Sequence, residues 1–449
     1  MSANPAPMNI EGIELVREEL ESHWLPFTDN KTFKDDPRLV IRGEGMYLWN
    51  QHGNRLLDGC SGLFTCAAGH CRPEITEAVA AQLAQLDYMP SFTRSHPGGF
   101  ELANKLTKIL PEGFNHVFFC NSGSESVDTA IKMALQYHHC RGEANRNIFV
   151  SRDRAYHGVN IGGTSLAGLV KNRHGFNAKM PNVVHMRATW DPDQVFSKKQ
   201  PLEKGHELAD DLLRAVQTYG GANIAACFVE PIAGSTGCLV PPVGYLDRLR
   251  EICDEHGILL VFDEVITGFG RTGAPFGADA FGVLPDIMTL AKALTNGAQP
   301  MGAVAVRDGI YDDIINAYPD DTIELAHGYT YSAHPAACAA GIATLDIYEK
   351  ENLFQHAAEI SNYFLDSIFA LQNLGVVTDI RGYGLLAAID VAHDGAPGMR
   401  GMKLQRRLFD AGLHIKATGD SVLIAPALIT EKEHIDEMCE ILKQELSQM

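Results

Sequence analysis

Apolar residues recur at two different spacings along the middle of the chain, and each spacing predicts a type of element. Residues 74–86 (EITEAVAAQLAQL), 99–110 and 127–139 carry apolar residues at helical spacing. Short apolar runs of strand length lie at 116–120 (HVFFC), 147–151, 222–231 and 257–265. Continuous apolar strands that alternate with helices are typical of a parallel sheet covered on both faces. We therefore predict an α/β fold whose large domain has a mostly parallel sheet sandwiched by helices.

The two ends of the chain show a different pattern. Residues 10–24 predict a short helix stopped by Pro26, and residues 47–59 predict a hairpin with its turn at 52–54. A long helix at 334–354 is followed by segments that predict a smaller α+β domain. We expect three parts: an N-terminal segment over 1–65, with a helix and a small antiparallel sheet that packs with the small domain, a large domain over 66–335, and a small domain over 336–449.

Composition and charge exclude several classes of function. The formal net charge is −19 and no cluster of Lys and Arg stands out, which argues against nucleic acid or an anionic membrane as a partner. The ten cysteines form no CxxC pair, so their spacing fits neither a zinc site nor a small disulfide scaffold, and we predict no metal. We find no secretory signal and no apolar run near the roughly 18–20 residues of a membrane span. These features predict a cytoplasmic protein.

Three segments carry candidate chemistry. NSGSES (121–126) separates a predicted strand from a predicted helix, and open backbone N–H groups at a helix start can hold a phosphate. Asp263 and Glu264 end a very apolar strand, where an acid is costly without a partner. Lys292 lies in another apolar stretch, where desolvation would lower its pKa and make it a candidate nucleophile.

Each segment alone has a plainer interpretation. The small residues could form an ordinary turn, Asp263 could be a satisfied buried acid, and Lys292 could extend its amine to solvent from a helix edge. Together, however, a phosphate cradle, a buried carboxylate and a buried amine are what pyridoxal 5′-phosphate requires. A nucleotide would need neither the amine nor that acid.

Six motifs in order make the chain resemble the class III (omega) aminotransferases of pyridoxal-phosphate fold type I, and within them the omega-amino acid or β-alanine:pyruvate branch. The motifs are SGSES, RAYHGVN, VEPIAGSTG, FDEVITGFGRTG, the lysine in LAKALTNGAQPMGAV, and HGYTYSAHPAACAAG. The resemblance runs nearly from end to end of the chain.

The resemblance implies roles for the residues around the cofactor ring. Lys292 resembles the catalytic lysine that binds the aldehyde and moves the proton, and Asp263 resembles the catalytic partner of the ring nitrogen. Tyr156 matches the aromatic residue stacked on one ring face and Val265 the residue on the other. Glu230 matches an acid that supports Asp263 and the side of the ring that bears the hydroxyl.

The resemblance also implies a phosphate site and a shared active site. Ser122, Gly123 and Ser124 match the residues that bind the phosphate, and Thr330 resembles a threonine that reaches the phosphate from the neighbouring subunit. We therefore expect a homodimer, with a homotetramer left open. His157 follows the stacking tyrosine and is placed with the cofactor-binding residues, although a purely structural role is the alternative.

The substrate pocket departs from the family's pattern at two positions. The arginine that often binds the substrate carboxylate is Lys416 here, which lacks the planar fork of a guanidinium. Lys416 either fills that role more weakly or is simply solvated. Phe64 stands where relatives often have tryptophan, which implies a roomier pocket. Trp24 and Tyr88 match segments that line the family's substrate entrance, as does Phe92. For Tyr88 and Phe92 a place in the ordinary core is the alternative that we favour.

The predicted activity is the transfer of an amino group from an omega-amino acid such as β-alanine, or from a primary amine, to pyruvate, through pyridoxal phosphate. The alternatives are a polyamine or taurine:pyruvate transaminase, an aminomutase or decarboxylase on the same scaffold, and a catalytically silent pyridoxal-phosphate-binding protein. The preferred donor stays open.

Overall fold

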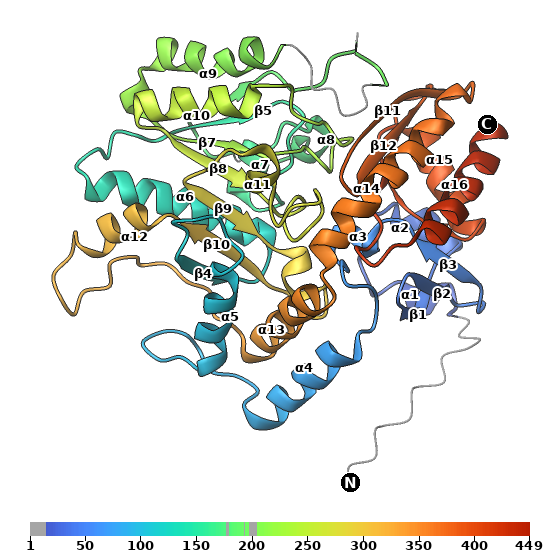
Figure 1. Cartoon of the computed structure of the whole chain (residues 1–449), viewed down its shortest axis with the longest axis horizontal. Helices are drawn as coiled ribbons and strands as arrows, with labels where there is room; N and C mark the ends of the chain where they lie inside the picture. Colours follow the sequence, from blue (N-terminus) through green and yellow to red (C-terminus); the bar gives the residue numbers. More distant parts are fainter. Residues whose placement is uncertain (1–14, 177–178, 193, 197–203) are drawn as a thin grey trace.

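A seven-stranded sheet forms the centre of the molecule in the computed structural model, which describes residues 15–176, 179–192, 194–196 and 204–449 (Figure 1). The strands, in spatial order, are β4 (His116–Cys120), β10 (Gly302–Val306), β9 (Ile287–Leu290), β8 (Leu259–Asp263), β7 (Ile224–Val229), β5 (Ile148–Arg152) and β6 (Val183–Met186). Only β10 runs antiparallel to its neighbours, and the other pairs are parallel. The prediction of an α/β fold with a mostly parallel sheet is confirmed.

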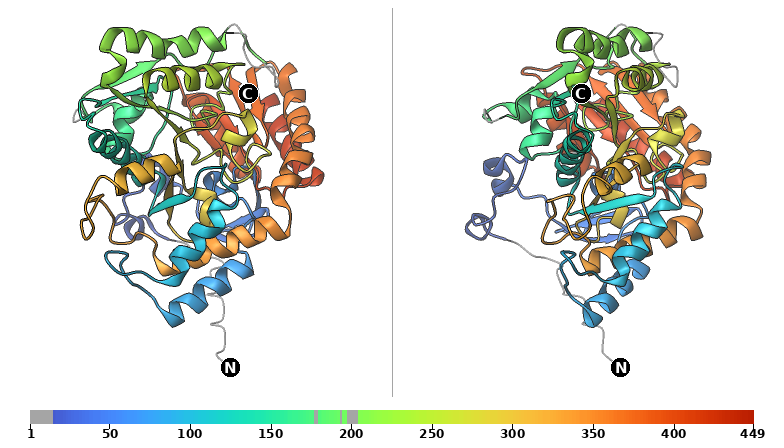
Figure 2. Two further views of the ribbon diagram at one scale, coloured as in Figure 1. Left: turned by 60° about the vertical axis from the view of Figure 1, so that its left-hand side comes forward. Right: turned by 90° about the vertical axis from the view of Figure 1, so that its left-hand side faces the viewer.

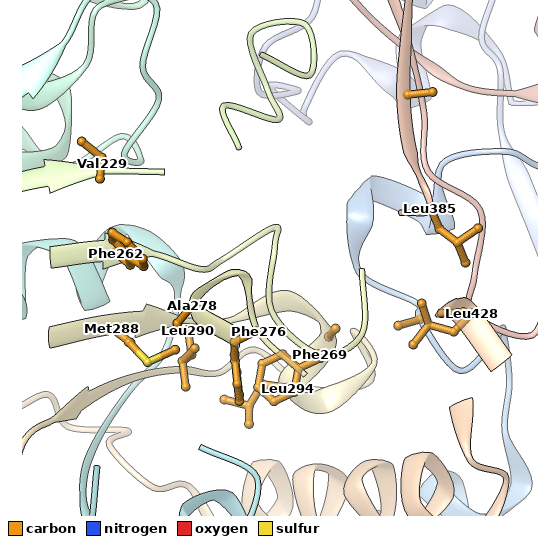
Figure 3. Packing of buried hydrophobic residues seen from close by; sticks show 14 of the residues in the cluster. Val229, Phe262, Phe269, Phe276, Ala278, Met288, Leu290, Leu294, Leu385 and Leu428 are labelled. Carbon is orange, nitrogen blue, oxygen red and sulfur yellow. The ribbon is translucent and has the colours of Figure 1, made fainter. Parts of the chain in front are cut away.

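Both faces of this sheet are apolar because helices cover both. On one face α6 (Gly123–Cys140) buries residues such as Ala130 and Met133 against Phe228 and Val261. The neighbouring strand residues point to the other face, where they join a larger cluster that includes α9 (Gly205–Tyr219) and α10 (Tyr245–His256). Figure 3 shows part of this second cluster, from Phe262 and Met288 through Phe269 to Leu385 and Leu428. The strands are continuous apolar runs in the sequence because both of their faces are buried.

Two four-stranded sheets flank the large one (Figure 2). One has the order β11 (Val377–Tyr383), β12 (Leu386–Val391), β15 (Ser421–Ile424) and β14 (Lys416–Thr418). The other has the order β1 (Val40–Glu44), β2 (Tyr47–Asn50), β3 (Arg55–Asp58) and β13 (Leu413–His414). The predicted hairpin is thus confirmed as β2–β3, and β13 pairs in parallel with β3, so a C-terminal strand completes the N-terminal sheet. The division at residues 65 and 335 stays a prediction.

The remaining helices lie around these sheets. They are α2 (Asn30–Asp35), α3 (Ser61–Phe64), α4 (Pro73–Gln85), α5 (Pro97–Thr107), α7 (Ile161–Leu166), α8 (Val170–Arg173), α11 (Gly277–Phe281), α12 (Asp308–Ile315), α13 (Pro335–Lys350), α14 (Leu353–Phe369), α15 (Met399–Asp410) and α16 (Lys432–Ser447), with short 3₁₀ turns at Gly221–Asn223, Lys292–Thr295 and Ala370–Asn373. Within the described residues no helix combines the length and apolarity needed to cross a membrane.

The N-terminal helix is shorter than the sequence pattern predicts. The prediction covered residues 10–24, of which 10–14 lie outside the described residues, and α1 spans only Arg17–Leu20. Its four residues include no buried one, and the preceding Leu15 and Val16 are 39% and 57% exposed. Because a short helix is marginal without an apolar face to bury, the periodic pattern alone does not sustain a longer one.

The topology places several chain reversals at one edge of the large sheet. β4 points in the same direction as β9, β8, β7 and β5, because β10 runs antiparallel between β4 and β9. The residues that follow these strands therefore meet at their shared carboxyl edge, where open α/β sheets bind ligands.

Candidate active site

A pocket at this carboxyl edge brings together most of the predicted cofactor residues. Its lining includes Gly123 and Ser124 from the start of α6, Tyr156 and His157 after β5, Glu230 after β7, Asp263 and Val265 at the end of β8, and Lys292 after β9. These residues are separated by up to 169 positions in the sequence, between Gly123 and Lys292. Their convergence follows from the parallel strand order.

Asp263 is a buried carboxylate, 6% exposed, with three hydrogen-bond donors. His157 Nδ1 lies 2.8 Å from Oδ2, while Thr289 Oγ1 and the Val265 N–H donate to Oδ1 at 3.1 and 3.2 Å. A carboxylate can accept about four hydrogen bonds, two on each oxygen. Oδ2 therefore keeps one acceptor position open at the pocket.

His157 is fixed beside Asp263 and is itself 1% exposed. Its Nε2 has no hydrogen-bond partner among the described residues, and its ring contacts the ring of Phe228 edge-on, with centroids 6.4 Å apart. In the tautomer that carries its proton on Nδ1, the ring donates to the carboxylate. His157 thus fixes the direction of one Asp263 oxygen.

Lys292 begins the 3₁₀ turn after β9, in a left-handed backbone conformation with φ of 51°. Such a conformation is strained for a residue with a side chain. The pKa of its amine is lowered to about 8, chiefly by burial and also by the nearby Lys416 ammonium, whereas the Asp263 and Glu230 carboxylates oppose the shift. The alternative that Lys292 extends its amine to solvent is wrong, because the amine lies in the pocket, 5.1 Å from the centre of the Phe64 ring.

Glu230 and Tyr156 form the wall next to Asp263. The Tyr156 N–H donates to Glu230 Oε1 at 3.1 Å. Burial raises the pKa of Glu230 to about 7, and the Asp263 carboxylate adds to this. Burial likewise raises the pKa of the Tyr156 hydroxyl. Glu230 is thus a carboxylic acid that changes its charge near neutral pH.

The start of α6 presents backbone donors to the pocket. The Ser122 hydroxyl caps the helix by accepting from the Glu125 N–H at 3.2 Å. The N–H groups of Gly123 and Ser124 have no acceptor within the described part of the chain. The Ser124 hydroxyl accepts from the Val159 N–H at 3.0 Å and retains its own proton for donation. These free donors at a helix N-terminus suit an anion.

Lys416 lies on β14 and is half-buried. Desolvation lowers the pKa of its amine, and it acts electrostatically on Lys292. Whether Lys416 binds a carboxylate or is solvated stays a prediction. Phe64, which is 2% exposed, faces Lys292 from the segment after β3.

Ser122, Phe64 and Lys416 are not among the residues that line the pocket, and four further predicted residues also lie outside it. Trp24 is 88% exposed, and Thr330 is also exposed, with its carbonyl accepting from the Tyr88 hydroxyl at 2.9 Å. The favoured alternative that Tyr88 and Phe92 belong to the core is wrong, since they are 36% and 50% exposed. Tyr88 contacts the loop near residue 330, where its ring lies edge-on to that of Tyr331 with the centroids 5.9 Å apart. The roles of these residues in binding stay predictions.

Two residues of the site have no clear signal in the sequence. Thr289 donates to Asp263, but it looks like any strand residue within IMTL. Gly158 has φ of 95°, and a Cβ atom there would lie 2.5 Å from Ser124 Oγ. A glycine directly after His157 is the one hint that the sequence offers of this close approach.

Comparisons with known proteins agree along the whole chain. A family model described as Aminotransferase class-III matches residues 31–446. An omega-aminotransferase of Caulobacter vibrioides is 49% identical over 433 residues, covering 96% of this chain and 98% of the relative. A beta-alanine–pyruvate aminotransferase of Pseudomonas aeruginosa is 46% identical over 443 residues, covering 98% and 99%. The omega transaminase of Pseudomonas jessenii, solved in complex with PMP, superposes with a TM-score of 0.92 at 31% identity, covering 97% of this chain and 98% of that one.

The desolvated amine yields the first testable prediction. In the cofactor-free protein, acetylation of Lys292 by acetic anhydride should depend on pH with a midpoint near 8, because burial lowers its pKa to about 8 and only the neutral amine reacts. Exposed lysines titrate near 10.4. Mass spectrometry of the peptide that contains Lys292, compared with one that contains the exposed Lys443, measures both midpoints in one sample. Coincident midpoints would contradict the assignment.

Proposed function

The chain belongs to the class III aminotransferases, with their α/β fold of pyridoxal-phosphate fold type I, and on this premise we propose that it transfers an amino group from an omega-amino acid such as β-alanine, or from a primary amine, to pyruvate. The proposal includes pyridoxal 5′-phosphate as the cofactor. The observation that carries it is the Lys292 amine, held in one pocket with the open acceptor position of Asp263 and the free N–H groups of α6.

The pocket residues fit the three parts of this cofactor. The α6 N–H groups and the Ser124 hydroxyl suit the phosphate. The open position on Asp263 Oδ2 suits a protonated ring nitrogen, and the Lys292 amine suits the aldehyde. Tyr156 and Val265 both line the pocket and would hold the two faces of the ring. Glu230 is positioned beside Tyr156, so its charge acts on the same ring.

The chain's own groups then have defined tasks. The bound cofactor supplies an aldehyde that takes the substrate amine and a ring that withdraws electrons from the substrate carbon. Lys292 Nζ removes the proton from that carbon and then passes it to another atom. It can act as a base because an amine with a pKa of about 8 is about one-tenth neutral at pH 7. Asp263 would hold the ring nitrogen through a hydrogen bond, and His157 orients the Asp263 carboxylate for it.

The choice of substrates rests on the named relatives and on Lys416. Of the two relatives reported above, one is named an omega-aminotransferase and the other a beta-alanine–pyruvate aminotransferase. Lys416 provides a second cation near Lys292 that can attract the carboxylate of pyruvate or of an omega-amino acid. Its single ammonium grips a carboxylate less specifically than a guanidinium does.

A homodimer completes the proposal. Thr330 is exposed and lies outside the pocket of its own chain, which supports a role in the partner's site. Phe92 and Tyr331, at 50% and 58% exposure, place further apolar surface around the same loop. A subunit contact would bury this surface.

We expect the protein to form alanine from β-alanine and pyruvate. Lys292→Ala should lower turnover about 10⁴-fold or more, because it removes both the nucleophile and the base. Alanine is measured by chromatography across a panel of omega-amino acids, polyamines, taurine and aryl amines. Lys443→Ala, at an exposed position of α16, is the matched control and should stay fully active.

An isomer or CO₂ released without pyruvate would contradict the proposed reaction, and turnover by Lys292→Ala would contradict the assigned base. If a polyamine or taurine is the best donor, the proposed donor class is wrong but the proposed reaction still stands.

Lys416 should affect carboxylated substrates selectively. Lys416→Ala should raise KM for pyruvate about tenfold, the usual worth of one charged hydrogen bond, and leave KM for an aryl amine donor nearly unchanged. Lys416→Arg should lower KM for pyruvate several-fold, because a guanidinium can bind both carboxylate oxygens. Equal effects on both substrate classes would contradict a carboxylate-binding role.

Hybrid dimers can show whether Thr330 acts on the partner's site. Thr330→Ala alone should weaken cofactor binding about tenfold, because it removes a hydrogen bond to a charged group. A dimer assembled from one Lys292→Ala and one Thr330→Ala subunit should contain one fully native site if Thr330 acts across the interface. Its activity should then approach half that of the wild type. Activity no higher than in Thr330→Ala homodimers would show that Thr330 acts within its own chain.

A further inference from the structure

The segment between β3 and α4 carries an unusual backbone. Ser61, Gly62 and Phe64 have φ of 46°, 66° and 60°, all in the left-handed region. For residues other than glycine this region is strained. Three residues with positive φ within four positions do not reflect the local preference of the chain, so contacts with other segments must hold them.

Side chains from within the segment hold part of this conformation. The buried Asp58 carboxylate accepts from the N–H groups of Cys60 and Gly62. His70 Nε2 lies 2.6 Å from the same carboxylate. The Gly62 carbonyl is bonded to His414 Nε2 at 2.9 Å, which ties the segment to the end of β13.

Ser61 makes the connection to the other parts of the fold. Its hydroxyl donates to the Ala425 carbonyl at 2.6 Å and accepts from Arg271 Nη2 at 3.1 Å. Both hydrogen-bonding functions of the hydroxyl are therefore used.

Arg271 bridges three segments without an ionic partner. Besides Ser61, its guanidinium donates to the carbonyls of Leu385, at 3.0 Å, and Pro426. It is 2% exposed, and none of the described carboxylates forms an ion pair with it. A planar fork of several donors can reach three acceptors at once, which an ammonium cannot. A buried guanidinium satisfied only by neutral acceptors is costly, so its contribution lies in joining the three segments that it bonds to.

The result of this arrangement is the position of Phe64. The ring is 2% exposed and its centre lies 5.1 Å from Lys292 Nζ, so it forms an apolar wall beside that amine. We propose that Ser61 and Arg271 are positioning residues that lock this strained segment and thereby fix the Phe64 wall and the size of donor that the pocket accepts. The part of the proposal that concerns donors rests on the proposed function.

The Ser61 position allows a test that separates backbone locking from simple packing. Ser61→Ala keeps the left-handed strain and removes the hydroxyl, whereas Ser61→Gly removes the hydroxyl together with the strain. If the hydroxyl holds a strained backbone, Ala should disturb the segment several-fold more than Gly. If the hydroxyl only fills space, Gly should be the more disruptive change.

Hydrogen exchange of the holoenzyme measures this without any substrate. Peptides covering residues 58–66 should exchange about tenfold faster in Ser61→Ala than in the wild type, after correction for intrinsic rates, with Ser61→Gly in between. Ser361→Ala, whose hydroxyl bonds only within α14, is the matched control and should leave these peptides unchanged. Unchanged exchange in Ser61→Ala, or faster exchange in Ser61→Gly than in Ser61→Ala, would overturn the locking of the segment.

Kinetics then test the link to Phe64. The ratio of kcat/KM for a bulky aryl amine to that for β-alanine should change about tenfold in Ser61→Ala and several-fold in Arg271→Lys. In a Phe64→Ala background, adding Ser61→Ala should change the ratio no further, because neighbouring residues that act through one wall are not additive. Fully additive effects, or an unchanged ratio, would overturn the positioning role. Failure of every donor would instead reject the proposed function while the exchange result still stands.

Discussion

A carboxylate at the end of a buried strand must be surrounded by donors, and Asp263 has three of them in His157, Thr289 and the Val265 N–H. Each donor fixes one direction around the carboxylate, so the single open position points into the pocket. An amine opposite such a group loses solvent but gains a negative charge nearby, and Lys292 has this balance. The position of the pocket thus follows from satisfying one buried acid where parallel strands end.

Backbone strain is concentrated around the same amine. Lys292 itself has φ of 51°, and the segment facing it contributes Ser61 and Phe64 in the same region. Strained residues persist only where the surrounding structure over-determines them. Here the surrounding structure includes both ends of the chain, since Ala425 and His414 bond to the segment that follows β3. The N-terminal segment, the large sheet and the C-terminal strands are therefore coupled at the site.

Burial of charge is what made the central residues predictable from the sequence. Asp263 and Lys292 stand out because each interrupts an apolar run, and the start of α6 stands out because small polar residues separate a strand from a helix. Thr289 and Arg271 do not stand out, because their roles depend on partners more than 20 positions away. Tyr88 and Phe92 were assigned to the core wrongly, since an aromatic residue gives no sign of which surface it faces. The predicted length of the N-terminal helix is wrong for a related reason. Periodicity shows an apolar face, but it does not show whether another element covers that face.

The charges around Lys292 explain why a single pocket can suit two unlike substrates under the proposed function. Glu230, with a pKa of about 7, is half-protonated at neutral pH, so it carries only part of its negative charge there. Lys416 is then a cation that the pocket carboxylates do not neutralise completely, and it is free to attract a substrate carboxylate. A donor without a carboxylate would leave that ammonium half-solvated, at little cost, because a lysine carries its charge on a flexible stem. A guanidinium at the same position would bind carboxylates more tightly, and uncharged donors would have to displace it. A lysine at this position therefore binds the keto acid less tightly than an arginine would, but it tolerates donors that lack a carboxylate.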